Sequence, residues 1–306
     1  MPSLDLLPKK DRDEVVRLEH IYHNDFAPKM RKHLKTLARR ASEPGSRFST
    51  RDLHSLFHDG AVHHCQRGII DRFWRDSPQE LPCSLALASR FGYLQGILPD
   101  NPESSRIEGY HVHHLLPALA ARDDVAVSAF LRRFRPPFLG GHRGTDLLCT
   151  GIHSVLRDDG SLWEDFAKRL TRSRRESRFV RAMLDCVVAI HEGNDKRFAS
   201  SMLEMMEFNR RTDLHLAMDK IVCVEAHAFM ALAQRHSPAC IRVFDRTSNL
   251  PWDAEFDQCL IQHLGLEGHG CYRSVSQVVS SWLLHLPDQI HAADLLATLD
   301  RDRTKP

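Results

Sequence analysis

The chain has 306 residues, of which 42% are hydrophobic and 27% charged, and its formal net charge at neutral pH is +2. These proportions argue against an intrinsically disordered chain, and the small net charge argues against a molecule that is basic all over, as a general binder of nucleic acid or anionic lipid would be. The N-terminal stretch MPSLDLLPKKDRDEVV has no apolar run ahead of a cleavage site, so we expect no secretory signal. The sequence also has no run of about 18 apolar residues, the length of a membrane-spanning helix. We therefore expect a cytoplasmic protein without a membrane partner.

The chain contains eight cysteines, none of them in a C-x-x-C motif: Cys65, Cys83, Cys149, Cys186, Cys223, Cys240, Cys259 and Cys271. Zinc knuckles and disulfide scaffolds bring cysteines together at short, regular spacings. The scattered spacing therefore predicts reduced, mostly buried thiols.

A long helix is predicted first, over residues 10–41, and Pro44 and Gly45 end it. A second helix is predicted to begin after Ser49 and Thr50, which are good N-cap residues, and to run past Phe73. Because Gly60 and Gly68 lie inside the second pattern, we expect that helix to bend or break there. The apolar stripe of the first helix consists of Val15, Leu18, Tyr22, Phe26, Met30, Leu34 and Leu37.

Helices are also predicted for most of the remaining chain. The clearest has an unbroken helical stripe that ends at Pro287. The only alternating pattern, at 240–244, is too short for us to expect a paired strand. The predicted helices are 82–97, 110–122, 124–135, 144–157, 161–171, 175–192, 195–209, 217–236, 253–264, 274–286 and 289–300.

Three stretches rich in proline, glycine, serine and asparagine are predicted to be loops, at 98–109, 136–144 and 245–252. The first is a candidate boundary between an N-terminal helical part, 1–100, and a body of helical hairpins, 101–306. The two parts could also form one continuous domain.

The segments LAARDDVAVSAFLRRF (119–134) and IHEGNDKRFASSMLEMM (190–206) share a helix end, a short polar turn and a new amphipathic helix. Alignment of Asp124 with Asp195 places them 71 positions apart. Repeats of this kind are typical of α-solenoids, in which antiparallel helix pairs bury their apolar faces on one another. We therefore predict an all-α, α-solenoid-like fold of stacked antiparallel helical hairpins, with little or no β structure.

Two histidine groups suggest a metal site as an alternative. His58–Asp59 is the dipeptide after which the HD phosphohydrolases, all-helical metal enzymes, are named, and His33 lies upstream of it. The dipeptide is a short match among 20 histidines, and Gly60 directly follows it. A metal-dependent, HD-like phosphohydrolase is therefore kept as the alternative function.

The second histidine group is His111, His113 and His114. The surrounding pattern predicts a helix, on which His111 and His114 share a face while His113 points about 100° away. Three ligands therefore do not converge from this segment. We expect at least one of the three rings to pack within the helix stack and none of them to hold a metal.

Catalytic and phosphate-binding motifs such as G-x-S-x-G, the Walker loop and H-E-x-x-H are missing from the sequence. We therefore expect no enzyme activity and no cofactor. Two basic runs suggest a nucleic-acid-binding helical repeat as a further alternative, but acidic residues interleave with them and no aromatic platform accompanies them. The runs are Lys29, Arg31, Lys32, Lys35, Arg39 and Arg40, and Arg169, Arg172, Arg174, Arg175, Arg178 and Arg181.

Residues 179–251 resemble the Immunity protein 49 family of bacterial polymorphic toxin systems. The resembling features are a helix that ends in a small-residue, Gly and Asp turn, a helix with an early Phe, and a helix that ends in Leu-Ala before a Pro-containing loop. The stretch Gln234–Ser237 departs from the family pattern, because it has no glycine at the helix end. The matching positions are Ala189, Gly193, Asp195, Phe198, Asp219, Ala226, Leu232, Ala233 and Pro251.

The resemblance implies an all-helical cytosolic protein that binds and neutralises a cognate toxin, delivered by a type VI or contact-dependent apparatus. It implies no catalytic residues, and it leaves open the toxin's activity and any self-association. If the toxin is a nuclease with a basic groove, acidic side chains would complement it. The candidate toxin-binding residues are Asp158, Asp159, Glu164 and Asp165.

Overall fold

Helices form nearly all the regular structure in the computed structural model, which describes residues 2–26, 28–29, 32, 36, 50–98, 104–136, 138, 143–173, 176–211, 220–246, 251–262 and 282–290. These residues contain no strand, so the all-α prediction is confirmed. Much of the predicted helices 10–41, 274–286 and 289–300 lies outside the described residues. Within those residues, no helix combines the length and the apolar composition needed to cross a membrane.

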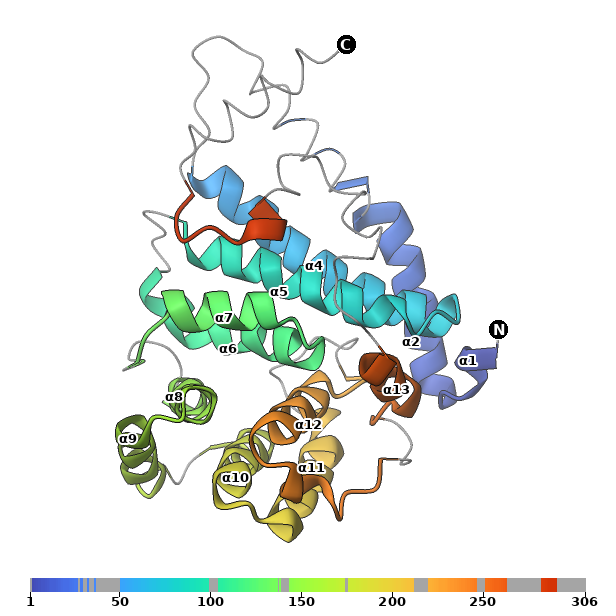
Figure 1. Ribbon diagram of the computed structural model, residues 1–306. Helices are drawn as coiled ribbons and strands as arrows, with labels where there is room; N and C mark the ends of the chain where they lie inside the picture. Colours follow the sequence, from blue (N-terminus) through green and yellow to red (C-terminus); the bar gives the residue numbers. More distant parts are fainter. Residues whose placement is uncertain are drawn as a thin grey trace.

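The N-terminal elements are α1 (Pro2–Asp5), α2 (Lys9–Ile21), a π-helical turn (Tyr22–Phe26), α4 (Thr50–Trp74) and α5 (Glu80–Gly96). α4 and α5 form a long pair, and α2 packs along α4 (Figure 1). The expected bend in the second helix is wrong, because α4 is continuous. A Cβ atom on Gly60 would lie 2.7 Å from Cδ1 of Phe91, and one on Gly68 would lie 2.8 Å from Cβ of Ser84. The two glycines therefore allow α4 and α5 to approach closely.

Three helical hairpins follow: α6 (Ser104–Ala120) with α7 (Asp124–Arg133), α8 (Arg143–Arg157) with α9 (Gly160–Leu170), and α10 (Arg178–Glu192) with α11 (Asp195–Asn209). The described chain continues with α12 (Val224–His236), a 3-10 helix η2 (Pro238–Ile241) and α13 (Ala254–Gln262). The loop predicted at 98–109 is shorter than expected, because α6 begins at Ser104.

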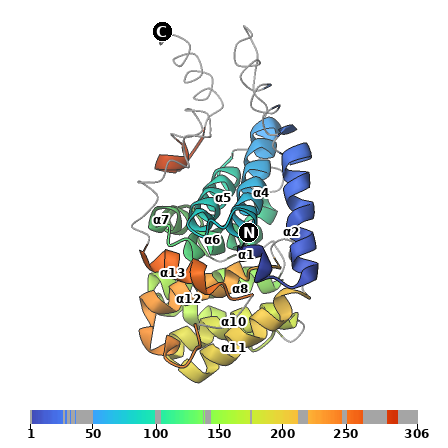
Figure 2. The same cartoon turned by 90° about the vertical axis from the view of Figure 1, so that its right-hand side faces the viewer.

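The first helices of the three hairpins surround α12. α6 contacts α8, α8 contacts α10, α10 contacts α12, and α12 returns to α6. Figures 1 and 2 show α6 and α7 beneath α4 and α5. The helices α10, α11 and α12 lie on the other side of α6, away from α4 and α5. The hairpins are therefore stacked as predicted, and the row of first helices closes through α12.

One connected cluster of buried apolar side chains extends from Leu4 to Ile290. It includes residues from α4 and α5 as well as from every hairpin. The core is therefore continuous across residue 100, where the sequence suggested a boundary.

Candidate functional site

The three hairpins share one turn geometry. In each turn the first residue has a left-handed backbone, with φ of 54° at Arg122, 52° at Asp158 and 67° at Gly193. The N–H of the next residue then bonds the carbonyl five positions earlier, which closes the helix end in the Schellman arrangement. These bonds are Asp123 N–H to Ala118 O (2.9 Å), Asp159 N–H to Ser154 O (3.0 Å) and Asn194 N–H to Ala189 O (2.9 Å).

The second residue of each turn caps the following helix. Its side-chain oxygen accepts a hydrogen bond from a backbone N–H in the first turn of that helix, which satisfies a donor that the helix itself leaves unpaired. The bonds are Ala126 N–H to Asp123 (3.2 Å), Leu162 N–H to Asp159 (3.2 Å) and Arg197 N–H to Asn194 (3.0 Å). The turn positions 122, 158 and 193 are spaced by 36 and 35 residues, so the sequence contains three copies of this hairpin.

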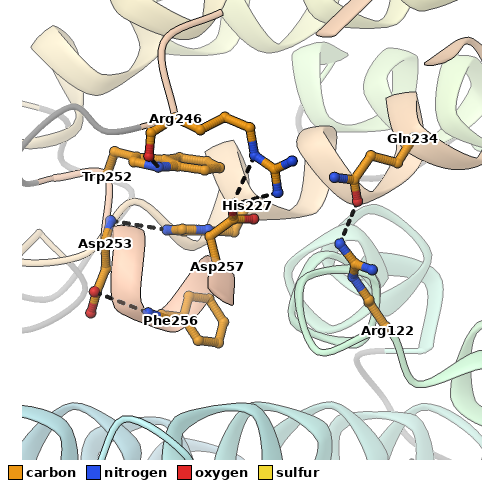
Figure 3. A network of polar contacts seen from close by, with 8 residues as sticks. All are labelled: Arg122, His227, Gln234, Arg246, Trp252, Asp253, Phe256 and Asp257. Atoms are coloured by element: carbon orange, nitrogen blue, oxygen red, sulfur yellow. Dashed lines mark hydrogen bonds and ion pairs between the residues drawn. The ribbon is translucent and has the colours of Figure 1, made fainter. Parts of the chain in front are cut away.

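The three turns gather round the C-terminal end of α12. Arg122 donates a hydrogen bond to Gln234 (Figure 3), and Arg235 forms an ion pair with Asp124 at 2.7 Å. Partial burial and Arg235 lower the pKa of His236, and the nearby carboxylate of Asp158 opposes this shift. Just beyond α12, the Cys240 thiol donates to Ala189 O at 3.1 Å, next to the third turn. We call residues 121–124, 157–160, 192–195 and 234–237 the turn cluster.

An aromatic pair lies beside the turn cluster. The Trp163 ring of α9 stacks on the imidazole of His191, near the end of α10, with ring centroids 3.5 Å apart and planes inclined by 18°. Trp163 is half-buried and His191 is exposed. A half-exposed tryptophan among charged side chains is typical of the residues that dominate protein–protein binding.

The predicted toxin-binding residues lie on the second turn and on α9. Asp158 and Glu164 are exposed, and within the described chain neither side chain has a hydrogen-bond or ion-pair partner. Asp159 accepts from the Ser161 hydroxyl at 2.7 Å and from two backbone N–H groups, which lowers its pKa. Asp165 pairs with Arg169 at 3.2 Å. Asp158 and Asp159 therefore belong to the turn cluster, while Glu164 and Asp165 continue from it along α9.

A buried ion pair holds the first turn in place. Asp123 is buried, and both of its carboxylate oxygens accept hydrogen bonds from the Arg90 guanidinium of α5, at 2.6 and 2.7 Å. A third Arg90 donor, Nη1, bonds Leu283 O at 2.7 Å. Among the described residues, Asp159 and Asn194 have no such arginine. The first turn is therefore tied into the core, and the second is not.

A second buried ion pair anchors α13. Arg72 of α4 bonds both carboxylate oxygens of Asp253, at 2.6 and 3.1 Å, and one of these oxygens also caps α13 at the N–H of Phe256 (3.1 Å). The Asp253 N–H donates to Nε2 of His227 at 3.2 Å (Figure 3). The His227 ring stacks on Trp252 with a centroid distance of 4.0 Å.

Burial lowers the pKa of His227 to about 3, so this histidine is neutral at physiological pH. Its Nε2 already accepts the Asp253 N–H, so that nitrogen is not free to take a proton from a substrate. The arrangement therefore assigns His227 a structural role, in which it fixes the chain ahead of α13 against α12.

A small cavity of about 10 Å³ lies where α6, α8, α10 and α12 meet. This is room for about one water molecule. Its polar lining comes from His113, Thr145 and Glu225, and its apolar lining from Val112, Leu116, Leu148, Phe179, Val180 and Met183.

The three histidines of α6 are placed as follows. The His114 ring packs over Gly92, and a Cβ atom added to Gly92 would lie only 2.2 Å from Cγ of His114. The expectation that at least one of the rings packs within the helix stack is therefore confirmed. His113 lines the cavity, and the side chain of His111 lies outside the described residues.

The His58–Asp59 pair is split by its helix. His58 is exposed, whereas Asp59 is buried and pairs with Lys29 at 3.2 Å. His33 lies outside the described residues. Among the residues that the structure describes, no group of three or more His, Cys, Asp or Glu side chains is arranged to hold a metal ion.

Several residues of the predicted basic runs have local partners. Arg169 pairs with Asp165, Arg181 donates to Ser173 O, and the Arg178 guanidinium lies 5.2 Å from the centroid of the Phe208 ring. Arg31, Lys35, Arg39, Arg40, Arg174 and Arg175 lie outside the described residues.

The expectation that all the thiols are reduced is wrong for one residue, because Cys83 is disulfide-bonded. The other described cysteines are free. Burial raises the pKa of Cys149, Cys186 and Cys223 well above the usual value, so these thiols are poor nucleophiles.

The middle copy of the hairpin was not predicted from the sequence, and neither were the roles of Arg122, Trp163 and Arg235. The signal was present, because Arg122-Asp123, Asp158-Asp159 and Gly193-Asn194 recur at nearly equal spacing. The contacts of Trp163 and Arg235 join hairpins that are far apart in the chain, so no local pattern indicates them.

Comparison of the chain with protein-family models, curated proteins and solved structures finds no match.

Proposed function

We propose that this protein is an immunity protein, which binds a toxin effector and neutralises it by direct contact through the turn cluster. The observation that carries the proposal is the convergence of three hairpin turns and the end of α12 on one exposed region, beside the Trp163–His191 pair. The resemblance of residues 179–251 to the Immunity protein 49 family supplies the class of partner.

The composition of this region suits protein recognition. Arg122 and Arg235 lie among Asp124 and Asp158, so the turn cluster, beside the Trp163–His191 pair, carries charges of both signs. Interfaces commonly combine an aromatic or arginine centre with a polar rim. Rigid hairpin turns also present these side chains with little conformational entropy to lose on binding.

The acidic residues on the second turn and α9 supply a more specific hypothesis. Asp158 and Glu164 are exposed carboxylates without a hydrogen-bond or ion-pair partner in the described chain, so they could pair with basic groups of a toxin without breaking such a bond. A basic toxin groove would be attracted to them at long range.

The first test is co-expression with the product of the adjacent gene. Rescue of growth and co-purification of the two proteins are the expected results. Failure of both would remove the proposal.

Charge removal then tests the surface. The variant Asp158→Asn/Asp159→Asn/Glu164→Gln/Asp165→Asn keeps a capping side chain at residue 159 and removes four charges. We expect it to weaken toxin binding by at least about tenfold, mainly through slower association in low salt. The matched control is Glu204→Gln/Glu207→Gln on α11, which should leave the affinity unchanged.

Trp163→Ala tests the aromatic pair, with an expected loss of about 30-fold in affinity if the ring lies at the centre of the interface. Equal affinities for wild type, Trp163→Ala and the charge variant would place the binding surface elsewhere. Circular dichroism of each variant checks that the helices are retained.

A further inference from the structure

The C-terminal segment 282–290 packs on a part of the chain nearly 200 residues earlier. Leu283, Leu286 and Ile290 are at most 2% exposed, and the Trp282 ring meets Phe57 of α4 edge-on, with centroids 6.3 Å apart. The segment lies near α4 and α5 in Figure 1. Two polar contacts fix it further, from Tyr93 O–H to Pro287 O at 3.2 Å and from Arg132 to Asp288 at 2.7 Å.

Arg90 is the residue that joins this segment to the turn cluster. It is 3% exposed, and its guanidinium divides its donors between two parts of the chain. Nη1 bonds Leu283 O at 2.7 Å, while Nε and Nη2 bond the two carboxylate oxygens of Asp123 at 2.6 and 2.7 Å. One buried side chain therefore holds the C-terminal segment and the first turn together.

Asp123 in turn organises the first turn. Its carboxylate caps α7 at Ala126, and its backbone N–H closes the end of α6 at Ala118. The residues on either side of it, Arg122 and Asp124, bond Gln234 and Arg235 of α12. A change in the position of Asp123 would therefore move the contacts between the first turn and α12.

We infer that Arg90 is a positioning residue that couples the seating of segment 282–290 to the geometry of the turn cluster. When the segment leaves, the buried guanidinium loses its hydrogen bond to Leu283 O. Loss of a buried hydrogen bond is unfavourable, so either water enters or the guanidinium turns away from Asp123, and both changes loosen the first turn. Because such coupling is reciprocal, a partner that rigidifies the turn cluster also holds the segment more firmly.

The three equivalent turns provide an internal control for the test. The experiment is amide hydrogen exchange on the full chain, comparing wild type with Leu286→Ala, which removes a buried contact of the segment. We expect exchange at Asp123, Ala126 and Val127 to become about tenfold faster. Exchange at Asp159 and Leu162 of the second turn, and at Asn194 and Arg197 of the third, should not change.

Leu284→Ala is the matched control variant, because Leu284 is 41% exposed on the same segment, and it should leave all three turns unchanged. Tyr93→Phe removes the hydrogen bond to Pro287 O and the contact of the hydroxyl with Arg132, which pairs with Asp288 of the segment, and it keeps the ring in the core. It should produce a smaller acceleration at the first turn, and it provides a test should Leu286→Ala not fold.

Two outcomes would overturn the inference. One is faster exchange of the segment itself, at the amide of residue 286, without any change at the first turn. The other is equal acceleration at all three turns, because this would indicate general destabilisation instead of a specific link.

The inference rests on the proposed function only in regarding the turn cluster as the partner surface. The affinity of the toxin for Leu286→Ala tests that part, with an expected loss of about tenfold. If the wild type binds no toxin, the proposed function fails, while the exchange experiment still decides whether Arg90 couples the segment to the turn.

Discussion

The turn after α6 and the turn after α8 have the same backbone geometry in different surroundings. Both begin with a left-handed residue, close the preceding helix with the same hydrogen bond and cap the next helix with an aspartate. Asp123 of the first turn is buried and bonded by Arg90, whereas Asp159 of the second is reached by solvent and bonded only by its own helix. Local sequence therefore sets the shape of each turn, and tertiary contacts set how much of the fold depends on it.

The largest expected difference between the two turns comes from Asp123→Ala. The substitution uncaps α7 and leaves the Arg90 guanidinium buried without its counter-charge, so we expect a loss of about 3–5 kcal/mol in the free energy of unfolding. Urea denaturation followed by circular dichroism measures this loss.

The double variant Arg90→Met/Asp123→Ser is the control for Asp123→Ala. It removes both charges and keeps a capping hydroxyl, so it should be more stable than Asp123→Ala. A double variant less stable than Asp123→Ala would show that the charge pair is not the main cause of the loss.

Acid should destabilise the packing of α12, the helix that bonds the first turn. Burial holds the pKa of His227 at about 3 and that of His63 at about 4, below the ordinary histidine value of 6.5. Between the folded-state pKa of each histidine and pH 6.5, the unfolded chain binds more protons than the folded chain. Stability should therefore be full above about pH 6.5 and fall as the pH drops towards 4, by up to about 1.4 kcal/mol per pH unit for each histidine.

Urea denaturation at several pH values measures this slope. His227→Gln removes one titrating group and leaves an acceptor for the Asp253 N–H, so its slope should be shallower than that of the wild type. An unchanged slope in His227→Gln would mean that this histidine is not responsible.

Asp159→Ala should destabilise the second turn less than Asp123→Ala destabilises the first. It removes only the cap of α9, so we expect the thermal midpoint to fall by a few degrees. Asp159→Ser should restore most of the loss, because the serine hydroxyl can accept the same backbone bonds. A loss as large as that of Asp123→Ala would mean that the second turn has tertiary support comparable to the first.

The smallest effect is expected from Asp158→Gly. Asp158 has a left-handed backbone that glycine adopts without steric penalty, so the variant should be more stable by up to about 1 kcal/mol. Gly193→Ala makes the opposite change at the third turn and should be destabilised by about 1 kcal/mol. Thermal denaturation measures the change in stability of both variants. A Gly193→Ala variant more stable than the wild type would contradict the left-handed backbone of the turn residue.

Much of the fold could be predicted from the sequence, because helices such as α8, α9 and α10 bear a clear apolar stripe and α7 and α11 begin after clear turn signals. Asp124 and Asp195, aligned at an offset of 71 residues, are the first residues of α7 and α11. The prediction at Gly60 and Gly68 failed, because glycine inside a helix indicates either a break or a close helix contact, and only the neighbouring helix decides between them.

The candidate site was less predictable, because it depends on contacts between distant parts of the chain. Asp158 and Asp159 were proposed as toxin-binding residues from their charge, and this stays a prediction, whereas the structure shows that Asp159 serves as a helix cap. Arg90 gave no sequence signal, since its partners Asp123 and Leu283 lie 33 and 193 positions away.

The return of α12 to α6 fixes the number of hairpins. In an open array of repeats, a unit can be added or removed because each unit contacts only its neighbours. Here the last helix of the row contacts the first, and Gln234 and Arg235 bond the first turn. An additional hairpin of 35 or 36 residues would separate these partners, so changes in the length of this chain should be tolerated in its loops and not in its repeat count.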